Sequence, residues 1–524
     1  MGQVIDMENS DPNKNIREQV EQRKQEMQQW GSGNDGGSGG VNSDFVMQCL
    51  RANELGDGML FAAMQRGRFI YNKQAGEWMQ WQGNFWSRDI MEHSLQTCEE
   101  LAVRYLEEAE QIDEKIGKAA QDGNKDEQRR LETLKKSLHR RVDRLRSTRG
   151  RQNTLSFAHT CENGLGIDGS EMDMNPYLLA CQNGVIDLRT GQVRQGRRDD
   201  YLSMASPVEW HGIEDECPTW EKSLLEIMNE QQEMVDFLQR VFGAAILGKN
   251  SENAFFVFSG QGRNGKSLVV ETLSWILGDL AAPIASDMLV DQGKNRNSSG
   301  PSPDIMSLRG LRLAFAAETD EGCRISTSRV KWLTGDDSLV GRNPHDKYNS
   351  TFPATHSLFL LTNNRPHAPA DDFAFWERLY LIPFELSFVN REPQGENERR
   401  QDRTLKTKFR QEASGILAWI VRGCLQYQKL GLAPPPKVKE AVAEYRRDED
   451  LLADWIEERC VMGENYETSS TVLYSDFEEW YQENVGKKVP SQRAFGRMLA
   501  KKFEKSKKGT VSYKGIALRA DEQF

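Results

Sequence analysis

The chain has 524 residues, of which 38% are hydrophobic and 28% charged, and its formal net charge is −11. This length accommodates about three domains, and the composition excludes a wholly disordered or fibrous chain. No apolar run approaches the roughly 20 residues that cross a bilayer, so we expect no membrane association. The negative charge excludes a uniformly basic surface for nucleic acid, so any such site must be local.

The amino-terminal part is predicted to begin with a flexible segment over residues 1–43. This segment contains a short amphipathic helical pattern at 13–30 and the linker-like run GSGNDGGSGG at 31–40. An α+β domain is predicted over residues 44–205, because hairpin and helical patterns follow one another there and short strands with Asn-Gly and Thr-Gly turn signals close it.

Three tryptophans, Trp78, Trp81 and Trp86, lie in the hairpin-like region at residues 53–88. Stacking on nucleic-acid bases is one interpretation of them. Packing within the hairpins is the favoured interpretation, because aromatic cross-strand pairs stabilise small sheets.

A long helical stretch is predicted over residues 93–150, with a break near Gly123. Its second half, residues 128–151, carries ten lysines or arginines against two acids, and its leucines fall on one face. Two interpretations remain open. The basic residues contact phosphates, or they form a solvated face that balances the acidic half of the stretch.

A phosphate-binding loop is the strongest motif of the chain. The apolar strand pattern at 254–258 runs into GQGRNGKS at 260–267 and then into a helical pattern, which is the strand, loop and helix context that such a loop requires. Loop N–H groups and the positive end of the helix bind phosphate oxygens, so ATP with Mg²⁺ is the expected cofactor. Lys266 would bridge the β and γ phosphates, and the Ser267 hydroxyl would bind Mg²⁺. The predicted nucleotide-binding residues are Gly260, Gln261, Gly262, Arg263, Asn264, Gly265, Lys266 and Ser267.

Three further polar residues adjoin apolar strand patterns downstream. Glu318 follows the strand pattern at 311–317 and is predicted to hold Mg²⁺ and activate the attacking water, with Asp320 and Glu321 just beyond it. Asn363 follows the next strand pattern and is predicted to orient that water or sense the γ phosphate, although its Asn-Asn-Arg-Pro context is also ordinary loop chemistry. Arg378 precedes a further strand pattern, where a cation delivered across a subunit boundary would stabilise the transferred phosphate, although the local sequence alone indicates no more than a surface arginine.

Taken together, these blocks resemble the superfamily III helicases, and among them the poxvirus-type family found in phage and plasmid primase-helicases. The resemblance rests on SGQGRNGKS, AFAAETDEG, KWLTGDDSLVGR, FLLTNNRP and FWERLYLIPF, in that order, and extends weakly upstream to LLACQNGVIDLRTGQV and downstream to AVAEYRRDEDLLADWIEERC. One departure is that Ala317 precedes Glu318 where the family often has adjacent acids. It therefore stays open which of Glu318, Asp320 and Glu321 holds Mg²⁺ and which activates the water.

The resemblance implies an AAA+-like ATPase over residues 206–430, with a parallel sheet core, that assembles into a hexameric ring. ATP would lie between subunits, and Arg378 would reach the neighbour's site. Members of the family generally move 3′ to 5′ on single-stranded DNA. A hairpin at residues 340–347 would carry Arg342, His345 and Lys347 into the central channel, although this segment is equally compatible with an ordinary polar turn.

A winged-helix-like DNA-binding domain is predicted over residues 431–524, because three helical patterns and a hairpin pattern follow Pro434-Pro-Pro436 there. Eleven lysines or arginines stand against one acid between residues 487 and 519, which concentrates positive charge. Lys501, Lys502 and Lys505 are the predicted phosphate contacts. A solvated lysine-rich tail is the alternative.

The resulting hypothesis is an ATP-dependent helicase that acts on single-stranded or forked DNA in replication of a phage, plasmid or other mobile element, in the cytoplasm of a bacterial host. The region before the ATPase lacks a convincing Asp-x-Asp catalytic strand, so we expect a separate primase or replication initiator as a partner. The alternative is an origin-binding or loading factor in which ATP acts as an assembly switch. A small-molecule kinase is disfavoured, because no lid-like arginine cluster follows the phosphate loop.

Overall fold

The computed structural model describes residues 41–249, 251–291, 300–317, 323–344, 348–485, 489–508 and 510–519. The chain divides into two compact units, Met1–Gly212 and Ile213–Phe524. The helix predicted at residues 13–30 and the linker predicted at 31–40 lie outside the described residues. Within the described ranges, no helix combines the length and the apolarity that a membrane span needs.

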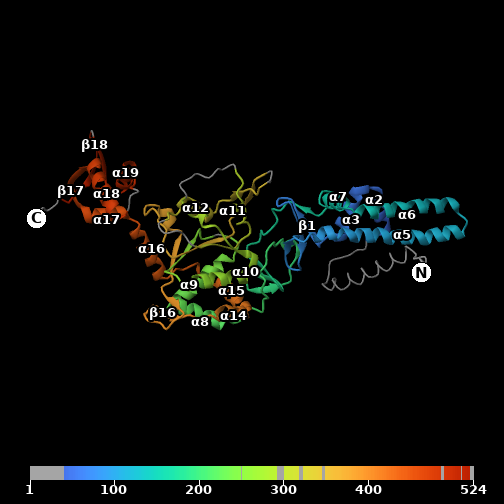
Figure 1. The fold of residues 1–524 in the computed structure, drawn as a ribbon, viewed down its shortest axis with the longest axis horizontal. Coiled ribbons are helices and arrows are strands. Elements are labelled where there is room, and N and C mark those ends of the chain that lie inside the picture. Colours follow the sequence, from blue (N-terminus) through green and yellow to red (C-terminus); the bar gives the residue numbers. More distant parts are fainter. Residues whose placement is uncertain are drawn as a thin grey trace, which may run out of the picture. The chain divides into compact units, whose positions relative to one another are not determined.

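The first unit is built on a bundle of helices. Two of them, α5 and α6, form a long antiparallel hairpin that is visible in Figure 1, and the chain turns between them at Gly123, whose φ is +69°. The break predicted near this glycine is therefore confirmed. The bundle core includes Leu101, Tyr105 and Leu138. The helices of this unit are α2 (Ser43–Arg51), α3 (Asn53–Gln65), α4 (His93–Gln96), α5 (Cys98–Gln121), α6 (Lys125–Leu145) and α7 (Thr148–Ala158).

Two small sheets complete the first unit. One has the strand order β3-β2-β1-β4 and the other β5-β6-β7. Their strands are β1 (Phe69–Asn72), β2 (Glu77–Trp81), β3 (Trp86–Arg88), β4 (Gly166–Ile167), β5 (Leu178–Cys181), β6 (Gly184–Asp187) and β7 (Gln192–Arg194). Trp86 is buried and pairs across the strands with Trp81, while Trp78 packs against Phe61 and Tyr71. The predicted packing of the three tryptophans within the hairpins is confirmed.

A buried ion pair ties three helices of the first unit together. Arg141 of α6 donates to Asp57 of α3 at 3.1 Å and to Asn53 at 2.8 Å, while the Tyr105 hydroxyl of α5 donates to Asp57 at 3.0 Å. Burial raises the pKa of Asp57 to about 6, although Arg141 acts in the opposite direction. The carboxylate is tolerated in the bundle because a cation and a hydroxyl satisfy it there.

Replacing Arg141 with Met is expected to destabilise the helical bundle by ~3–5 kcal/mol, because it leaves a buried carboxylate without its cation. Hydrogen exchange of α3, α5 and α6 amides measures this opening free energy in the full chain. The control is Arg130→Ala, whose ion pair with Glu127 is exposed and is expected to contribute less than about 0.5 kcal/mol. Equal effects of the two substitutions would contradict a special role for the buried pair.

The second unit is organised around a five-stranded parallel sheet of order β14-β8-β13-β10-β9. Its strands are β8 (Phe255–Ser259), β9 (Ala281–Pro283), β10 (Leu313–Ala317), β13 (Ser357–Thr362) and β14 (Leu379–Pro383). The predicted parallel sheet core is thus observed. These strands read as continuous apolar runs because both faces of a parallel sheet are covered by other elements.

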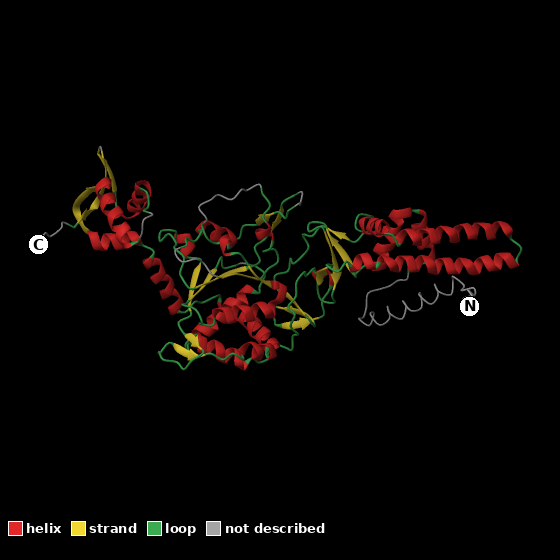
Figure 2. Ribbon diagram, viewed as in Figure 1, coloured by secondary structure: helices red, strands yellow, loops and turns green. Residues whose placement is uncertain are grey.

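Helices cover both faces of this sheet (Figure 2). Alternate residues of a strand point to opposite faces. Phe256 and Phe258 of β8 point toward α9, where Phe242 packs on Phe258, whereas Phe255 and Val257 belong to the core on the other face. The first layer includes α8 (Pro218–Ile227), α9 (Gln232–Ala245), α10 (Lys266–Leu277), α14 (Leu405–Gln411) and α15 (Ala413–Leu430), and the second includes α11 (Pro303–Met306), α12 (Thr327–Leu333), α13 (Phe373–Trp376) and α16 (Pro436–Asp448).

A separate hydrophobic core lies at the carboxy-terminal end of the second unit. Its elements are α17 (Leu451–Arg459), β17 (Cys460–Ser469), α18 (Ser470–Asn484), α19 (Gln492–Lys502), β18 (Lys505–Lys508) and β19 (Thr510–Leu518), with the strand order β17-β19-β18. We call residues 451–519 the carboxy-terminal module.

The boundary of this module needs a correction. The prediction placed it at residue 431, on the proline run, but Ala441 and Tyr445 of α16 pack in the same core as the parallel sheet. The prolines begin α16 instead of separating two domains, because proline is tolerated in the first turn of a helix. The module therefore begins at α17.

Candidate nucleotide-binding site

The loop between β8 and α10 has the geometry expected of a phosphate cradle. Gly262 and Gly265 both have φ of +89°, and Arg263 between them has φ of +51°, so the chain turns through left-handed conformations. Gly265 caps α10 without offering a side chain, which leaves the first N–H groups of the helix free for an anion. The loop lies at the carboxyl edge of the parallel sheet, where ligands of such sheets bind.

Close packing explains two of the glycines. A Cβ at Gly260 would lie 2.1 Å from Nδ2 of Asn264 and 2.3 Å from the carbonyl oxygen of Phe384. The buried Asn264 amide donates to that same carbonyl at 3.3 Å, so it ties the loop to the chain directly after β14. A Cβ at Gly265 would lie 2.9 Å from Ile227 of α8. The backbone contact therefore requires glycine at position 260, whereas at position 265 the φ of +89° favours glycine and the Ile227 side chain could shift.

Lys266 and Asn363 meet in this site although 97 positions separate them in the sequence. The Lys266 ammonium donates to the Gly260 carbonyl at 2.5 Å and to the Asn363 side-chain oxygen at 3.1 Å. The meeting follows from the sheet, because β13 pairs directly with β8 and Thr362 is in register with Ser259. Both side chains emerge where the two strands end.

Burial changes the acidity of Lys266. The side chain is only 5% exposed, and this desolvation lowers its pKa from 10.5 to about 8. Among the described residues, no carboxylate contributes to that shift. A bound polyphosphate would supply the missing negative charge and favour the ammonium form.

Binding of ATP is therefore expected to be coupled to proton uptake between about pH 8 and pH 10.5. Below pH 8 Lys266 already carries its proton, so uptake approaches zero, whereas above pH 8 the phosphates draw a proton onto the amine. Calorimetric titrations of ATP in buffers of different ionisation enthalpy measure the number of protons. Uptake that does not rise between pH 7 and pH 9 would contradict this assignment of the lysine.

The expected magnesium ligands are only partly within the described structure. Ser267 is exposed in the first turn of α10, so its hydroxyl is accessible beside the loop. Glu318, Asp320 and Glu321 lie outside the described residues, but β10, which precedes them, pairs with β13. A hydroxyl at the helix start suits Mg²⁺, which prefers oxygen ligands and takes most of the rest from phosphates and water.

Arg378 lies at the opposite edge of the sheet from the phosphate loop. Its carbonyl accepts the N–H of Phe255, the first residue of β8, whereas the loop follows the last residue of that strand. Five strand residues span about 16 Å, which exceeds the reach of an arginine side chain. The guanidinium donates to the Ala374 carbonyl at 2.8 Å, and its buried Nε has no hydrogen-bond partner among the described residues.

The loop that follows Asn363 is held by α16. Arg365 lies 3.5 Å from Asp448, and the Tyr445 hydroxyl donates to the Pro366 carbonyl. The Glu449 carboxylate, directly after α16, accepts the Ala368 N–H at 3.0 Å. Local sequence patterns do not predict these contacts, because they join segments about 80 residues apart in the chain. They position the segment that runs from Asn363 toward α13 and Arg378.

Two paired strands lie where the channel hairpin was predicted. Strands β11 (Leu339–Gly341) and β12 (Ser350–Phe352) are antiparallel neighbours, and Arg342 begins the connection between them. The backbone of Arg342 is fixed by two hydrogen bonds with Ser302 at 2.8 and 3.2 Å. His345 and Lys347 lie outside the described residues.

The predicted cations of the carboxy-terminal module differ in whether they have an ion-pair partner within the described structure. Lys505 is exposed on β18, whereas Lys502 forms an ion pair with Asp450 at 2.8 Å. Lys501 lies within α19, but its side chain is outside the described set.

Two arginines of α19 were missed by the sequence analysis. Arg493 and Arg497 are exposed one helical turn apart, on the side away from the buried Phe495 and Leu499. Their i, i+4 spacing opposite an apolar pair could have identified this face.

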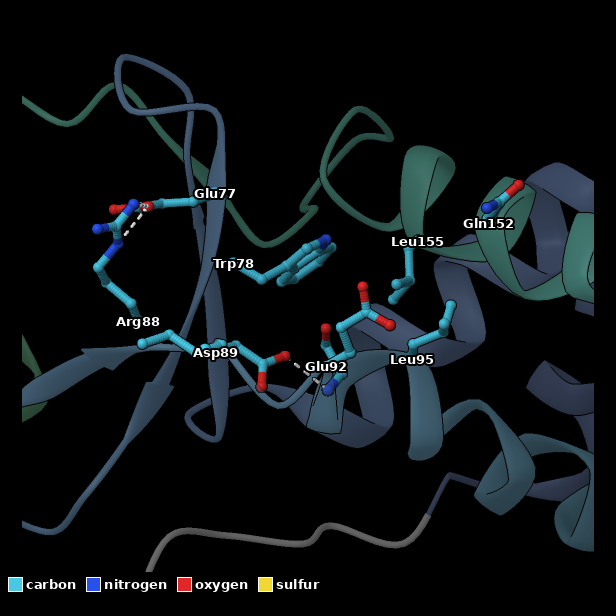
Figure 3. A pocket seen from close by; sticks show the side chains of 10 residues that line it. Glu77, Trp78, Arg88, Asp89, Glu92, Leu95, Gln152 and Leu155 are labelled. Carbon is cyan, nitrogen blue, oxygen red and sulfur yellow. Dashed lines mark hydrogen bonds and ion pairs between the residues drawn. The ribbon is translucent and has the colours of Figure 1, made fainter. Parts of the chain in front are cut away.

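A second hollow, of about 360 Å³, lies in the first unit (Figure 3). Its walls include Trp78, Leu95 and Leu155. Its charged residues are three acids, Glu77, Asp89 and Glu92, and one arginine, Arg88. Arg88 pairs with Glu77 at 2.6 Å, and the Asp89 carboxylate accepts two N–H groups at the start of α4. This excess of negative charge does not favour a phosphate ligand.

Family comparisons match two regions of the chain. A family described as "D5 N terminal like" matches residues 58–229, and a family described as "Poxvirus D5 protein-like" matches residues 447–517. The first match runs from α3 to the end of α8, and the second runs from the end of α16 into β19. The predicted resemblance to the poxvirus-type primase-helicase family is thereby confirmed.

The relatives with sequence similarity include viral proteins. "Putative helicase L207/L206" of Acanthamoeba polyphaga mimivirus is 29% identical over 335 residues, which is 62% of this chain and 35% of that protein. "Putative helicase 121R" of Invertebrate iridescent virus 3 is 26% identical over 369 residues, with 63% and 38% covered. "Putative primase C962R" of African swine fever virus is 22% identical over 334 residues, with 60% and 34% covered. The chain thus spans about a third of the length of these relatives.

Among solved structures, "The A form apo structure of NrS-1 C terminal region-CTR" is similar at 13% identity and a TM-score of 0.37, with 60% of this chain and 78% of that chain covered.

Proposed function

We propose that this chain, which carries both regions of the poxvirus D5-type proteins, is an ATP-dependent DNA helicase that works as a ring, with six subunits the expected number. The observation that carries the proposal is the contact of the Lys266 ammonium with both the Gly260 carbonyl and the Asn363 amide at the carboxyl edge of the sheet. The names of the relatives support an action on DNA in replication.

In the proposed reaction, water attacks the γ phosphate of ATP in line with the leaving ADP oxygen, and ADP and phosphate are released. Lys266 neutralises charge on the β and γ phosphates, and Asn363 orients the water or senses the γ phosphate. The Ser267 hydroxyl and the Glu318 carboxylate would hold Mg²⁺, which shields the phosphate charge. Glu318 would also take the proton of the attacking water.

Arg378 is proposed to act on the site of a neighbouring subunit. The strand length between Arg378 and its own phosphate loop excludes an action within one subunit in this conformation. A guanidinium aimed at the γ phosphate would stabilise the charge that develops there. Each subunit would then contribute a phosphate loop to one interface and an arginine to the other, as in a closed head-to-tail ring.

Two regions are proposed to contact DNA. In the ring channel, the hairpin cations Arg342, His345 and Lys347 would touch the backbone of a single strand, with movement in the 3′ to 5′ direction. The carboxy-terminal module has the helix and strand order of a winged-helix domain, and we assign Lys501, Lys502 and Lys505, together with the α19 arginines, to its DNA contacts. Lys502 must first leave Asp450.

The biological setting is proposed to be replication of a viral genome, with a separate primase or replication initiator as a partner. The named relatives come from viruses and include a protein named as a primase. They give no support to the plasmid setting or the bacterial host that the sequence motifs suggested.

Strand displacement on a forked duplex tests the proposal. The full chain is expected to release the labelled strand in the presence of ATP and Mg²⁺, and Lys266→Ala is expected to lower both ATP turnover and release by 100-fold or more, on the order of a lost phosphate contact. If single-stranded DNA stimulates ATP turnover but no strand is released at either polarity, the chain is the ATP-switched loading factor and the helicase assignment is wrong.

Subunit mixing tests the position of Arg378. Arg378→Ala and Lys266→Ala subunits are each expected to be inactive alone, while ATP binding survives in Arg378→Ala. In an equimolar mixture, about a quarter of the interfaces combine an intact phosphate loop with an intact arginine, so ATP turnover is expected to return to about that fraction. No recovery in mixtures that form rings would contradict action across the interface.

A further inference from the structure

The outward face of α6 carries a row of cations. The apolar residues of this helix, among them Leu138 and Val142, pack into the helical bundle core, so the opposite side of α6 faces away from it. Four basic residues on that side are separated by 4, 7 and 4 positions and fall within about 60° of one another around the helix axis. All four are exposed, and we call them the α6 basic stripe: Lys125, Arg129, Lys136 and Arg140.

Other cations of this segment form ion pairs within the first unit, and this distinguishes them from the α6 basic stripe. Lys135 pairs with Asp113 at 2.7 Å, Arg146 with Glu99 at 2.8 Å, and Arg151 with Glu99 at 3.0 Å. Arg141 and Arg144 pair with acids of α3.

These pairs thus engage two acids of α5, Asp113 and Glu99, and two acids of α3. The stripe residues have no ion pair with any other described residue. Glu132 and Asp143 are the carboxylates on the same face, and Glu132 accepts a hydrogen bond from Gln128 at 3.0 Å.

We propose that the α6 basic stripe binds the phosphate backbone of DNA, at a site separate from the ATPase and from the carboxy-terminal module. The stripe extends over 15 residue steps, about 22 Å of helix. B-DNA advances 3.4 Å per nucleotide of one strand, so the stripe matches about six nucleotides. The neighbouring α5 exposes both acids and lysines, among them Glu114, Lys115 and Lys118, so the continuous row of cations on α6 is the side of the hairpin that favours a polyanion. The contact carries no sequence information, because it involves phosphates alone.

The test is a full-length variant in which all four stripe residues are changed to Gln, a residue that keeps helix propensity. Anisotropy titrations with labelled single-stranded and duplex oligonucleotides over a salt series are expected to show at least a 10-fold loss of affinity at low salt. The slope of log K against log salt is expected to fall by about 3, since each phosphate contact contributes 0.7–0.9. Thermal unfolding of the variant checks that the helical hairpin is intact.

The matched control removes four other exposed cations of the same unit, Lys115→Gln, Lys118→Gln, Arg130→Gln and Arg149→Gln, and so the same net charge. The salt slope of this control is expected to stay within about one of the wild type. Equal losses of DNA affinity in the two variants would mean that only the net charge matters, and this would overturn the proposal. Wild-type affinity of the stripe variant would overturn it too. Both titrations are repeated without nucleotide in the Lys266→Ala background, where the stripe effect is expected to persist even if the helicase assignment fails.

Discussion

The parallel pairing of β8 with β13 on one side and with β14 on the other decides which side chains can reach the loop between β8 and α10. Because β13 is in register with β8, Asn363 emerges beside the phosphate loop and its amide oxygen accepts from Lys266. Because β14 runs in the same direction, a residue that precedes it must lie at the far edge of the sheet. The same backbone hydrogen bonds therefore bring one polar residue into the site and keep Arg378 out of it.

This arrangement gives the unit two chemically different edges. One edge has a glycine loop, a desolvated lysine and a helix start, all of which favour a polyanion. The other has an arginine whose Nε lacks a partner within the described structure. The proposed ring would bring these two edges together between copies of the chain. The helix α16 contacts the segment between Asn363 and α13, and the carboxy-terminal module follows it in the chain.

Ion pairing within the fold determines how much of the positive charge is available to a partner. The chain is acidic overall, and many of its lysines and arginines form ion pairs with carboxylates, as Lys502 does with Asp450 and Arg141 with Asp57. A count of cations along the sequence therefore overestimates the charge that a polyanion meets. Among the exposed cations without an ion pair in the described ranges, two groups lie on single helix faces, on α6 and on α19, where the apolar residues occupy the other side.

The sequence by itself determined the local elements of the site. The phosphate loop between a strand and a helix, the parallel apolar strands, the break at Gly123 and the family resemblance all depend on residues close together in the chain, and local patterns record them. Only the tertiary structure decided that Lys266 contacts Asn363, that Arg378 faces away from its own loop, that α16 belongs to the sheet core, and which cations are paired. These features depend on strand order and on contacts between segments about 50 to 100 positions apart, which local periodicity does not encode.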